Sequence, residues 1–182
     1  PGSETIVVTG GTFNGDYFCT FNDNDVVAVS GGRFKNPLKF GYCAEGYAPT
    51  FTPDGDGYYT VGTPVAKIGD DNFASLADAI SLLPTNGAPA TITMIADVTI
   101  PQAASGMGVV FPATANATLD LNGHTISGTD ASGKAYYMIW NNGTLTIKDG
   151  SEAKTGKITY TSSTPDGSWG YATTTVMNNK GV

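Results

Sequence analysis

The feature that most constrains the fold is a repeat near the start of the chain. The stretch IVVTGGTF, which begins at Ile6, matches VAVSGGRF, which begins at Val27, with an offset of 21 residues. Apolar residues alternate along both copies, and a Gly-Gly pair follows at the same place in each. A period of about 20 residues with this alternation favours the stacked coils of a solenoid. Two β-hairpins that share a turn type are the alternative.

Most of the later chain also has the pattern of short strands. After residue 84, apolar and polar residues alternate in the segments ATITMIADVTI, VVF, ATLDLNGHTI, YYMIW, GTLTI, GKITYT and TTTVM. The alternation predicts that Leu119 and Leu121 face the core and that Asp120 faces outward. Leu145 and Ile147 are predicted to face the core in the same way. Strands this short and numerous indicate an all-β sandwich, barrel or solenoid.

One segment, NFASLADAISLLP at residues 72–84, predicts a short α-helix. Its apolar face would consist of Phe73, Leu76, Ala77, Ile80 and Leu83. Ser75 and Asp78 have the spacing of a capping box, and Pro84 follows the helix. A helix of about two to three turns is stable only against a packing surface. We therefore expect it to cover the open edge of the β-structure.

Charged residues are few, at 14% of the chain, and the net charge is -7. Such a surface cannot neutralise phosphates, which argues against nucleic acid and anionic membranes as partners. No apolar run is long enough to span a membrane. The first three residues, PGS, look like the remnant of a cloning site. We divide the rest into Gly-Gly repeats with a hairpin connector (4–64) and a capping helix with the following strands (65–182).

Longer stretches resemble a known family. VAKIGDDNFASLADAISLLPTNGAPATITMIADVTI, TLDLNGHTISG, NNGTLTIKDG and GKI resemble a recurrent module of large surface proteins of Gram-positive gut bacteria. VSGGRFKNPLKFGYCAEGYAPTFTPDGDGYYTV resembles the connector that precedes that module. The resemblance implies a pectate-lyase-like, right-handed parallel β-helix (solenoid) with one short capping α-helix. The strand of Leu119 should then lie parallel to the strand of Leu145. The resemblance supplies no catalytic residues.

Repeated Asn-Asn pairs acquire a structural meaning in such a fold. IWNNGTLTI and VMNNKGV would place Ile139 beside Val176 and Asn141 beside Asn178 on adjacent coils. Stacked Asn side chains can hydrogen-bond from one coil to the next. We therefore expect the chain to be one period of a tandem array, cut within its repeat. Two unrelated turns would give the same pairs and are the alternative.

The two cysteines, Cys19 and Cys43, follow Phe13 and Phe34 at comparable places on adjacent coils of this arrangement. Neighbouring strands lie about 4.8 Å apart, and a disulfide needs Cα atoms ~4.4–6.8 Å apart. A secreted protein would permit the bond. We predict a disulfide between Cys19 and Cys43, with two buried free thiols as the alternative.

Polysaccharide lyases and glycoside hydrolases share this fold class, so an enzyme is one possible function. A hydrolase needs two suitably spaced carboxylates, and Asp120 and Asp149 do not form such a pair in the pattern. His124, the single histidine, follows Leu-Asn-Gly in a turn and is expected to be structural. Asp54 and Asp56 lie in a turn without the distal Glu of a Ca²⁺ loop. We expect no catalytic residues, no metal and no cofactor.

Aromatic residues are the candidates for ligand binding. If Ile139 faces inward, Trp140 faces outward, and Met177 occupies the matching position one repeat later. Trp169 and Tyr171 lie in a segment too long for a plain turn. Exposed aromatic residues suit the recognition of carbohydrate or protein. Packing of these residues against the β-structure is the alternative.

The resemblance implies a module of a bacterial cell-surface repeat protein, and the aromatic residues favour a non-catalytic binding or adhesion function for it. The expected partners are a host glycoprotein such as a secreted immunoglobulin or a mucin, or a glycan, together with neighbouring repeats of the same chain. The expected location is extracellular, with anchoring to the cell wall through the parent protein. A structural spacer of a surface stalk and a carbohydrate-active enzyme are the alternatives.

Overall fold

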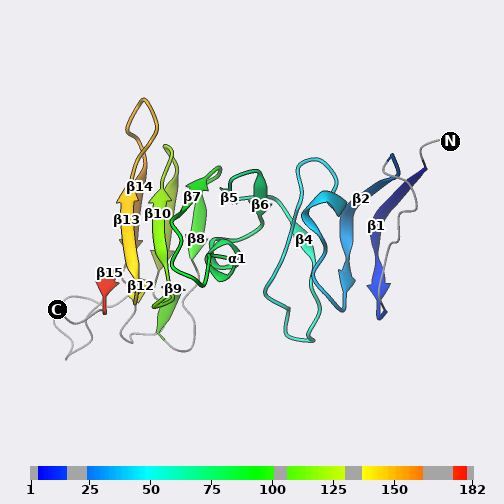
Figure 1. The fold of residues 1–182 in the computed structure, drawn as a ribbon, viewed down its shortest axis with the longest axis horizontal. Coiled ribbons are helices and arrows are strands. Elements are labelled where there is room, and N and C mark those ends of the chain that lie inside the picture. Colours follow the sequence, from blue (N-terminus) through cyan, green and yellow to red (C-terminus); the bar gives the residue numbers. More distant parts are fainter. Residues whose placement is uncertain (1–3, 16–23, 101–105, 130–136, 162–173, 180–182) are drawn as a thin grey trace. The chain divides into compact units, whose positions relative to one another are not determined.

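The structure, a computed structural model, describes residues 4–15, 24–100, 106–129, 137–161 and 174–179. It is mostly β-strand with one short α-helix among these residues, in agreement with the predicted all-β class. The chain divides into two compact units, residues 1–81 and 82–182 (Figure 1). This division falls after the helix, whereas the sequence suggested a division before it.

The first unit begins with two long parallel strands. It contains β1 (Thr5–Phe13), β2 (Val26–Phe34), the 3-10 helix η1 (Phe40–Tyr42), β3 (Ala48–Pro49), β4 (Val61–Gly62), β5 (Ala66–Ile68), β6 (Asp71–Phe73) and α1 (Leu76–Ser81). β1 and β2 pair in parallel, with Val8 beside Val29 and Phe13 beside Phe34. This is the offset of the sequence repeat, so the two copies stack and do not form hairpins. β3 pairs with β4, and β5 with β6, in antiparallel fashion.

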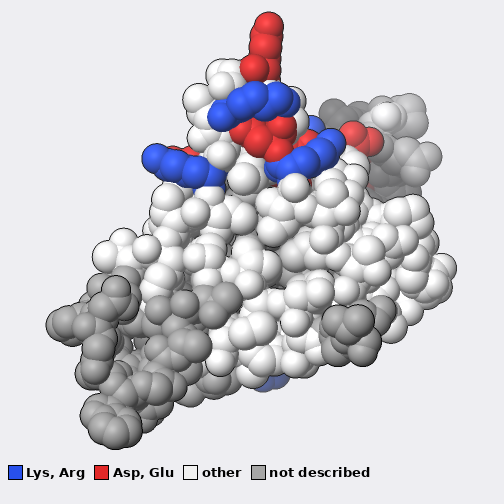
Figure 2. Space-filling model, turned by 90° about the vertical axis from the view of Figure 1, so that its left-hand side faces the viewer, with Lys and Arg blue, Asp and Glu red and all other residues white. Residues whose placement is uncertain are grey.

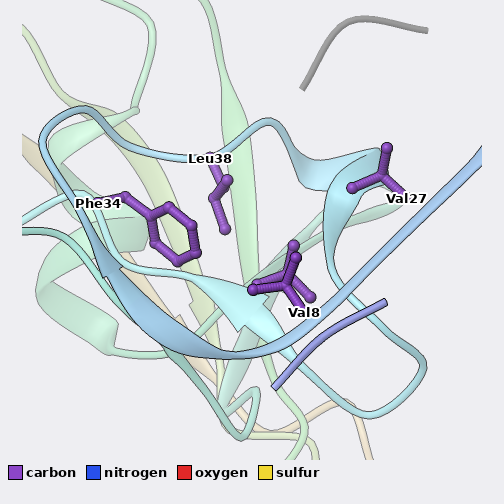
Figure 3. Packing of buried hydrophobic residues seen from close by; sticks show 5 residues of the cluster. Val8, Val27, Phe34 and Leu38 are labelled. Atoms are coloured by element: carbon purple, nitrogen blue, oxygen red, sulfur yellow. The ribbon is translucent and has the colours of Figure 1, made fainter. Parts of the chain in front are cut away.

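One buried cluster of the first unit contains residues of both copies of the repeat together with Leu38. It consists of Val8, Val27, Val29, Phe34 and Leu38, as Figure 3 shows. The rings of Phe13 and Phe34 stack with centroids 5.0 Å apart and planes 7° apart. A Cβ at Gly31 would collide with the carbonyl oxygen of Thr9 on the neighbouring strand. Close approach of the two copies therefore requires glycine at Gly31, and the positive φ angles of Gly11 and Gly32 favour glycine at the second position of each pair.

The helix α1 has most of the predicted apolar face and the predicted cap, but it differs from the prediction at Ala77 and at Asp78. Leu76, Ala79 and Ile80 are buried, but Ala77 is exposed because it lies beside that face and not on it. The Ser75 hydroxyl caps the helix by accepting the N–H of Asp78 at 3.0 Å. The buried carboxylate of Asp78 accepts hydrogen bonds from the Phe51 N–H and the Thr52 hydroxyl. Within the described residues, no helix is long and apolar enough to cross a membrane.

The second unit consists of three groups of parallel strands. Its strands are β7 (Ala90–Met94), β8 (Val98–Ile100), β9 (Met107–Phe111), β10 (Asn116–Asp120), β11 (Thr125–Thr129), β12 (Tyr137–Asn141), β13 (Thr144–Lys148), β14 (Lys157–Thr161) and β15 (Thr174–Asn178). The sheet orders include β13-β10-β7, β14-β11-β8 and β15-β12-β9. The chain therefore visits the three sheets in rotation and returns to each after two further strands. We call one strand from each sheet, taken in succession, a rung.

The predicted parallel pairing of the Leu119 and Leu145 strands is confirmed. β10 and β13 are parallel, and Leu119 pairs with Ile147. Leu119 is fully buried and Leu121 nearly so, whereas Leu145 is only half-buried and Ile147 is 36% exposed. The prediction that all four lie inside was therefore wrong for Ile147. β13 ends its sheet, so no described strand covers the far side of its inward residues.

The Asn-Asn repeat forms the predicted contacts between rungs. Asn141 pairs with Asn178, and its amide donates to the Asn178 side-chain oxygen at 3.1 Å. Asn179 donates to the side-chain oxygen of Asn142 at 2.9 Å. Asn141 also closes a tight turn by exchanging hydrogen bonds with the backbone of Gly143. The two Asn-Asn pairs therefore occupy equivalent places on successive rungs.

Candidate functional site

The clearest candidate for a binding surface is a row of apolar side chains across the sheet β9, β12 and β15. Trp140 pairs with Val110 on one side and with Met177 on the other. Val110 is 41% exposed, and Trp140 and Met177 are half-buried. Ile139, the preceding residue, is fully buried, and so is Met138 before it, so that burial does not simply alternate along β12. We call Val110, Trp140 and Met177 the aromatic row.

The ring of Trp140 is held in place by two neighbours. Its indole N–H donates to the side-chain oxygen of Asn142 at 2.9 Å. The Tyr137 ring meets it edge to face, with centroids 4.9 Å apart. The same Asn142 oxygen also accepts from Asn179. The Asn ladder therefore orients the indole, so that little side-chain entropy remains to be lost when a partner binds.

The sequence predicted two members of this row and missed the third. Trp140 and Met177 lie side by side as expected, and Val110 extends the row by one strand. Every residue of MGVVF is apolar or glycine, so no alternation of polar and apolar residues indicates that Val110 faces outward. The other two predicted ligand-binding residues, Trp169 and Tyr171, lie outside the described residues. Their role stays a prediction.

A polar groove lies on the neighbouring sheet of β8, β11 and β14. It has a volume of about 360 Å³ and is lined by Asp97, Val98, Thr99, Thr125, Ser127, Lys157 and Thr159. The registers place Ser127 between Thr99 and Thr159. The hydroxyl groups of Thr99 and Ser127 are 2.9 Å apart and share a hydrogen bond. We call this surface the hydroxyl groove.

One carboxylate stands at the edge of the hydroxyl groove. Asp97 accepts the N–H of Thr125 at 2.8 Å, and this hydrogen bond is the main reason why the pKa of Asp97 is lowered. The imidazole Nδ1 of His124 lies 3.4 Å from the same carboxylate. Among the described residues that line the groove, Asp97 is the single carboxylate. A hydrolytic mechanism with two carboxylates would need a second one there.

Asp120 and Asp149 were considered as catalytic carboxylates, but both stabilise turns. Asp120 was predicted to face outward, but it is only 8% exposed because the next rung covers it. It accepts the N–H of Gly150 at 2.6 Å and lies 3.1 Å from the ammonium of Lys148. Desolvation raises the pKa of Asp149, but hydrogen bonds from Ser151, Gly156 and Gly123 lower it to about 2.

In the acidic turn of the first unit, the carboxylates of Asp54 and Asp56 form ion pairs with an arginine of the same chain. The guanidinium of Arg33 lies 2.7 Å from Asp54 and 2.8 Å from Asp56. It also stands over the ring of Tyr58, 4.8 Å from the centroid. Within the described residues, no group of three or more His, Cys, Asp or Glu side chains could hold a metal ion.

Cys43 forms no disulfide with a described residue, and it is half-buried beside Val29, with which it forms a parallel bridge. Burial raises the pKa of the Cys43 thiol to about 11, so it is protonated at neutral pH and a poor nucleophile. Cys19 lies outside the described residues. The disulfide between Cys19 and Cys43 therefore stays a prediction.

Comparison of the chain with models of protein families found no match. Searches for similarity among curated proteins and among solved structures found none either. The function must therefore be argued from the residues of this chain alone.

Proposed function

We propose that the chain is a non-catalytic binding module of a bacterial cell-surface protein, and that its second unit is a right-handed parallel β-helix. The three parallel sheets visited in rotation support the fold proposal, as does the Asn ladder between successive rungs. The resemblance to modules of Gram-positive gut bacteria supports the extracellular, wall-anchored location. The expected partner is a host glycoprotein such as a secreted immunoglobulin or a mucin, or a glycan.

The observation that carries the binding proposal is the aromatic row. Val110, Trp140 and Met177 form a continuous partly exposed apolar surface across three strands. Tryptophan buries a large area with few rotatable bonds and is enriched where interfaces are strongest. A packing role alone would not require the indole to stay partly exposed while two neighbours fix its orientation. A pre-oriented apolar row of this kind suits the surface of a folded protein partner.

The test is a binding experiment with host secretions followed by variants of the row. The full chain is immobilised and exposed to purified secreted immunoglobulin, to mucin and to a mucin-derived glycan mixture. We expect saturable binding to one of them, and we expect Trp140→Ala to weaken it by about 2 kcal/mol, or about 30-fold. Thr146→Ala, an exposed residue on another sheet, is the matched control and should leave the affinity unchanged.

The result can contradict the proposal in two ways. If none of the three host materials binds saturably, the chain is not a binding module for them. If binding occurs but Trp140→Ala behaves like Thr146→Ala, the row is not the contact surface. Thermal melting of both variants must accompany the affinities. A melting temperature that falls with the affinity would assign Trp140 to packing.

A structural spacer is the second candidate, and the end of the stack favours it. β13, β14 and β15 are the terminal strands of their sheets among the described residues. Ile147 and Val176 are 36% and 37% exposed there, although Leu119 and Ile139 at the same places one rung earlier are fully buried. Figure 2 shows this face: charged side chains gather at one corner, and uncharged residues cover most of the described surface.

In the spacer reading, a further rung from a neighbouring repeat would cover this end. Parallel strands leave unpaired N–H and C=O groups at a sheet edge, and such an edge favours the addition of another strand. The two candidates differ in one measurement. A spacer shows concentration-dependent end-to-end association and no saturable host ligand, whereas a binding module shows a saturable ligand at concentrations where the chain is monomeric.

A further inference from the structure

The first unit contains a small pocket that neither the fold nor the proposed host-protein contact explains. It has a volume of about 260 Å³ and lies where η1, β3 and the turn between β5 and β6 meet. Its lining consists of Phe40, Gly41, Tyr47, Pro49, Asp70, Asp71 and Asn72. All of these residues belong to the first unit. We call this cavity the Tyr47 pocket.

The apolar wall of the Tyr47 pocket is rigidly supported. The Phe40 ring packs against Phe51 and Phe73, with centroids 5.2 Å away in both cases. Phe51 and Phe73 also contact each other, at 6.0 Å. Phe40 is nevertheless only half-buried, and Tyr47 is 40% exposed. Two aromatic side chains therefore remain accessible in a cavity whose shape the ring cluster maintains.

The polar wall carries two negative charges that the described residues do not neutralise. Asp70 and Asp71 are exposed, and within the described part of the chain no hydrogen bond or ion pair engages their carboxylates. Among the described aspartates, Asp54 pairs with Arg33 and Asp120 pairs with Lys148. Asp70 and Asp71 differ from these two, because their carboxylates stand unpaired beside an aromatic wall.

We propose that the Tyr47 pocket binds an organic cation, namely a quaternary ammonium or guanidinium head group. The face of an aromatic ring attracts a cation within about 6 Å of its centroid. Opposite charges attract more strongly where the walls of a pocket displace water. The described residues use this chemistry at two rings, because Arg33 and Lys35 stand over Tyr58 and Lys39 stands over Tyr42.

Size and charge restrict the class of ligand. The pocket is slightly smaller than the ~300–1,000 Å³ of typical small-molecule sites, so it suits a single head group and not an extended chain. The net charge of -7 opposes the approach of anions and favours that of cations, most strongly at low ionic strength. The head group belongs either to a small quaternary ammonium compound or to an arginine side chain of a protein partner, since both present a weakly hydrated cation to an aromatic ring.

The experiment titrates the full chain with three small probes while the tyrosine resonances are followed by NMR. The probes are choline, N-acetylarginine amide and 3,3-dimethylbutanol, the uncharged isostere of choline. We expect one or both cations to bind and to shift the Tyr47 signals. We expect the uncharged isostere to bind at least about tenfold more weakly, because it lacks the charge that the carboxylates attract. A preference for choline indicates a small quaternary ammonium compound, and a preference for N-acetylarginine amide indicates an arginine side chain of a protein.

Variants connect the signal to the pocket. The double variant Asp70→Asn with Asp71→Asn should weaken cation binding about tenfold or more, and added salt should weaken binding to the parent chain. Glu45→Gln removes one exposed carboxylate nearby that does not line the pocket, so the affinity should change less than twofold, i.e. about within error. Tyr47→Phe should retain binding and Tyr47→Ala should lose it.

Three results would overturn the proposal. The first is that neither cation binds, and the second is that 3,3-dimethylbutanol binds as well as choline. The third is that Asn at both positions leaves the affinity unchanged in a chain with an unaltered melting temperature. None of these results bears on Trp140, because the Tyr47 pocket and the aromatic row belong to different units.

Discussion

Truncation of Leu119 and of Ile147 to alanine tests how the stack of the second unit is stabilised. The two residues are direct neighbours in the register of β10 and β13, and both point toward the core. They differ in cover: Leu119 has described strands on both sides, whereas β13 is terminal. Leu119 is fully buried, and Ile147 is 36% exposed. The same truncation should therefore cost more free energy at Leu119.

The expected magnitudes follow from these exposures. Leu119→Ala removes about three methylene equivalents at about 0.8 kcal/mol each, or about 2.4 kcal/mol. A cavity closed by neighbouring strands adds to this, so we expect a loss of about 3–4 kcal/mol. Ile147→Ala removes a similar volume, but about one third of that surface is already in water and no closed cavity forms. We expect a loss of about 1–1.5 kcal/mol.

Urea unfolding followed by tryptophan fluorescence measures the difference. Both tryptophans, Trp140 and Trp169, belong to the second unit, so the signal reports the unit that carries the substitutions. The comparison is valid if the slope of the free energy against urea is the same in both variants. Equal losses for the two variants would refute the reasoning. They would mean that the end of the stack is covered, or that Leu119 lies in a region that relaxes freely.

Three further predictions follow from individual contacts. Gly143→Ala should destabilise the second unit by about 1–3 kcal/mol, because its Cβ would lie 2.6 Å from two carbonyl oxygens of an earlier loop. Gly55 has open space around it, so Gly55→Ala should leave the melting temperature unchanged. The folded pKa of Asp149, about 2, lies below the unfolded value of ~3.9, so its stabilisation is complete above pH ~4 and is lost as the pH falls toward 2. Asp149→Asn should therefore be less stable than the parent at pH 7 and should converge with it in acid-denaturation curves. Ile80→Asp should unfold the first unit by burying an unpaired carboxylate, whereas Leu82→Asp, at a residue 45% exposed, should melt like the parent.

The parallel stacking could be predicted because stacked residues repeat in the sequence. Ile6 matches Val27 and Val8 matches Val29, and the structure pairs the same residues. Side-chain alternation likewise predicts which residues point inward. It does not predict how deeply they are buried, because burial depends on whether another strand lies beyond. Ile147 has the pattern of a core residue and the exposure of an edge residue.

Local patterns also left the partners of polar residues undetermined. The spacing of Ser75 and Asp78 predicted the hydroxyl cap, which is a contact over three residues. The carboxylate of Asp78 instead accepts from Phe51 and Thr52, which lie more than 25 residues earlier. Asp120 was expected to be solvated because it follows an inward leucine on a strand. It is covered by Gly150, whose N–H arrives from the following rung.

The candidate sites differ in how far the sequence could reveal them, and the reason is the spacing of the rungs. Val98 pairs with Ile126 at a separation of 28 residues, Thr125 with Lys157 at 32, and Tyr137 with Thr174 at 37. The intervening turns differ in length, so no fixed period aligns the strands. Trp140 and Met177 could still be matched because an Asn-Asn pair directly follows each of them.

The hydroxyl groove has no such marker: Thr99, Ser127 and Thr159 are common residues in strands, and their adjacency follows from the register alone. The Tyr47 pocket depends likewise on the meeting of segments more than 20 residues apart. A chain of this kind therefore reveals in its sequence the contacts that repeat, and conceals those that occur once.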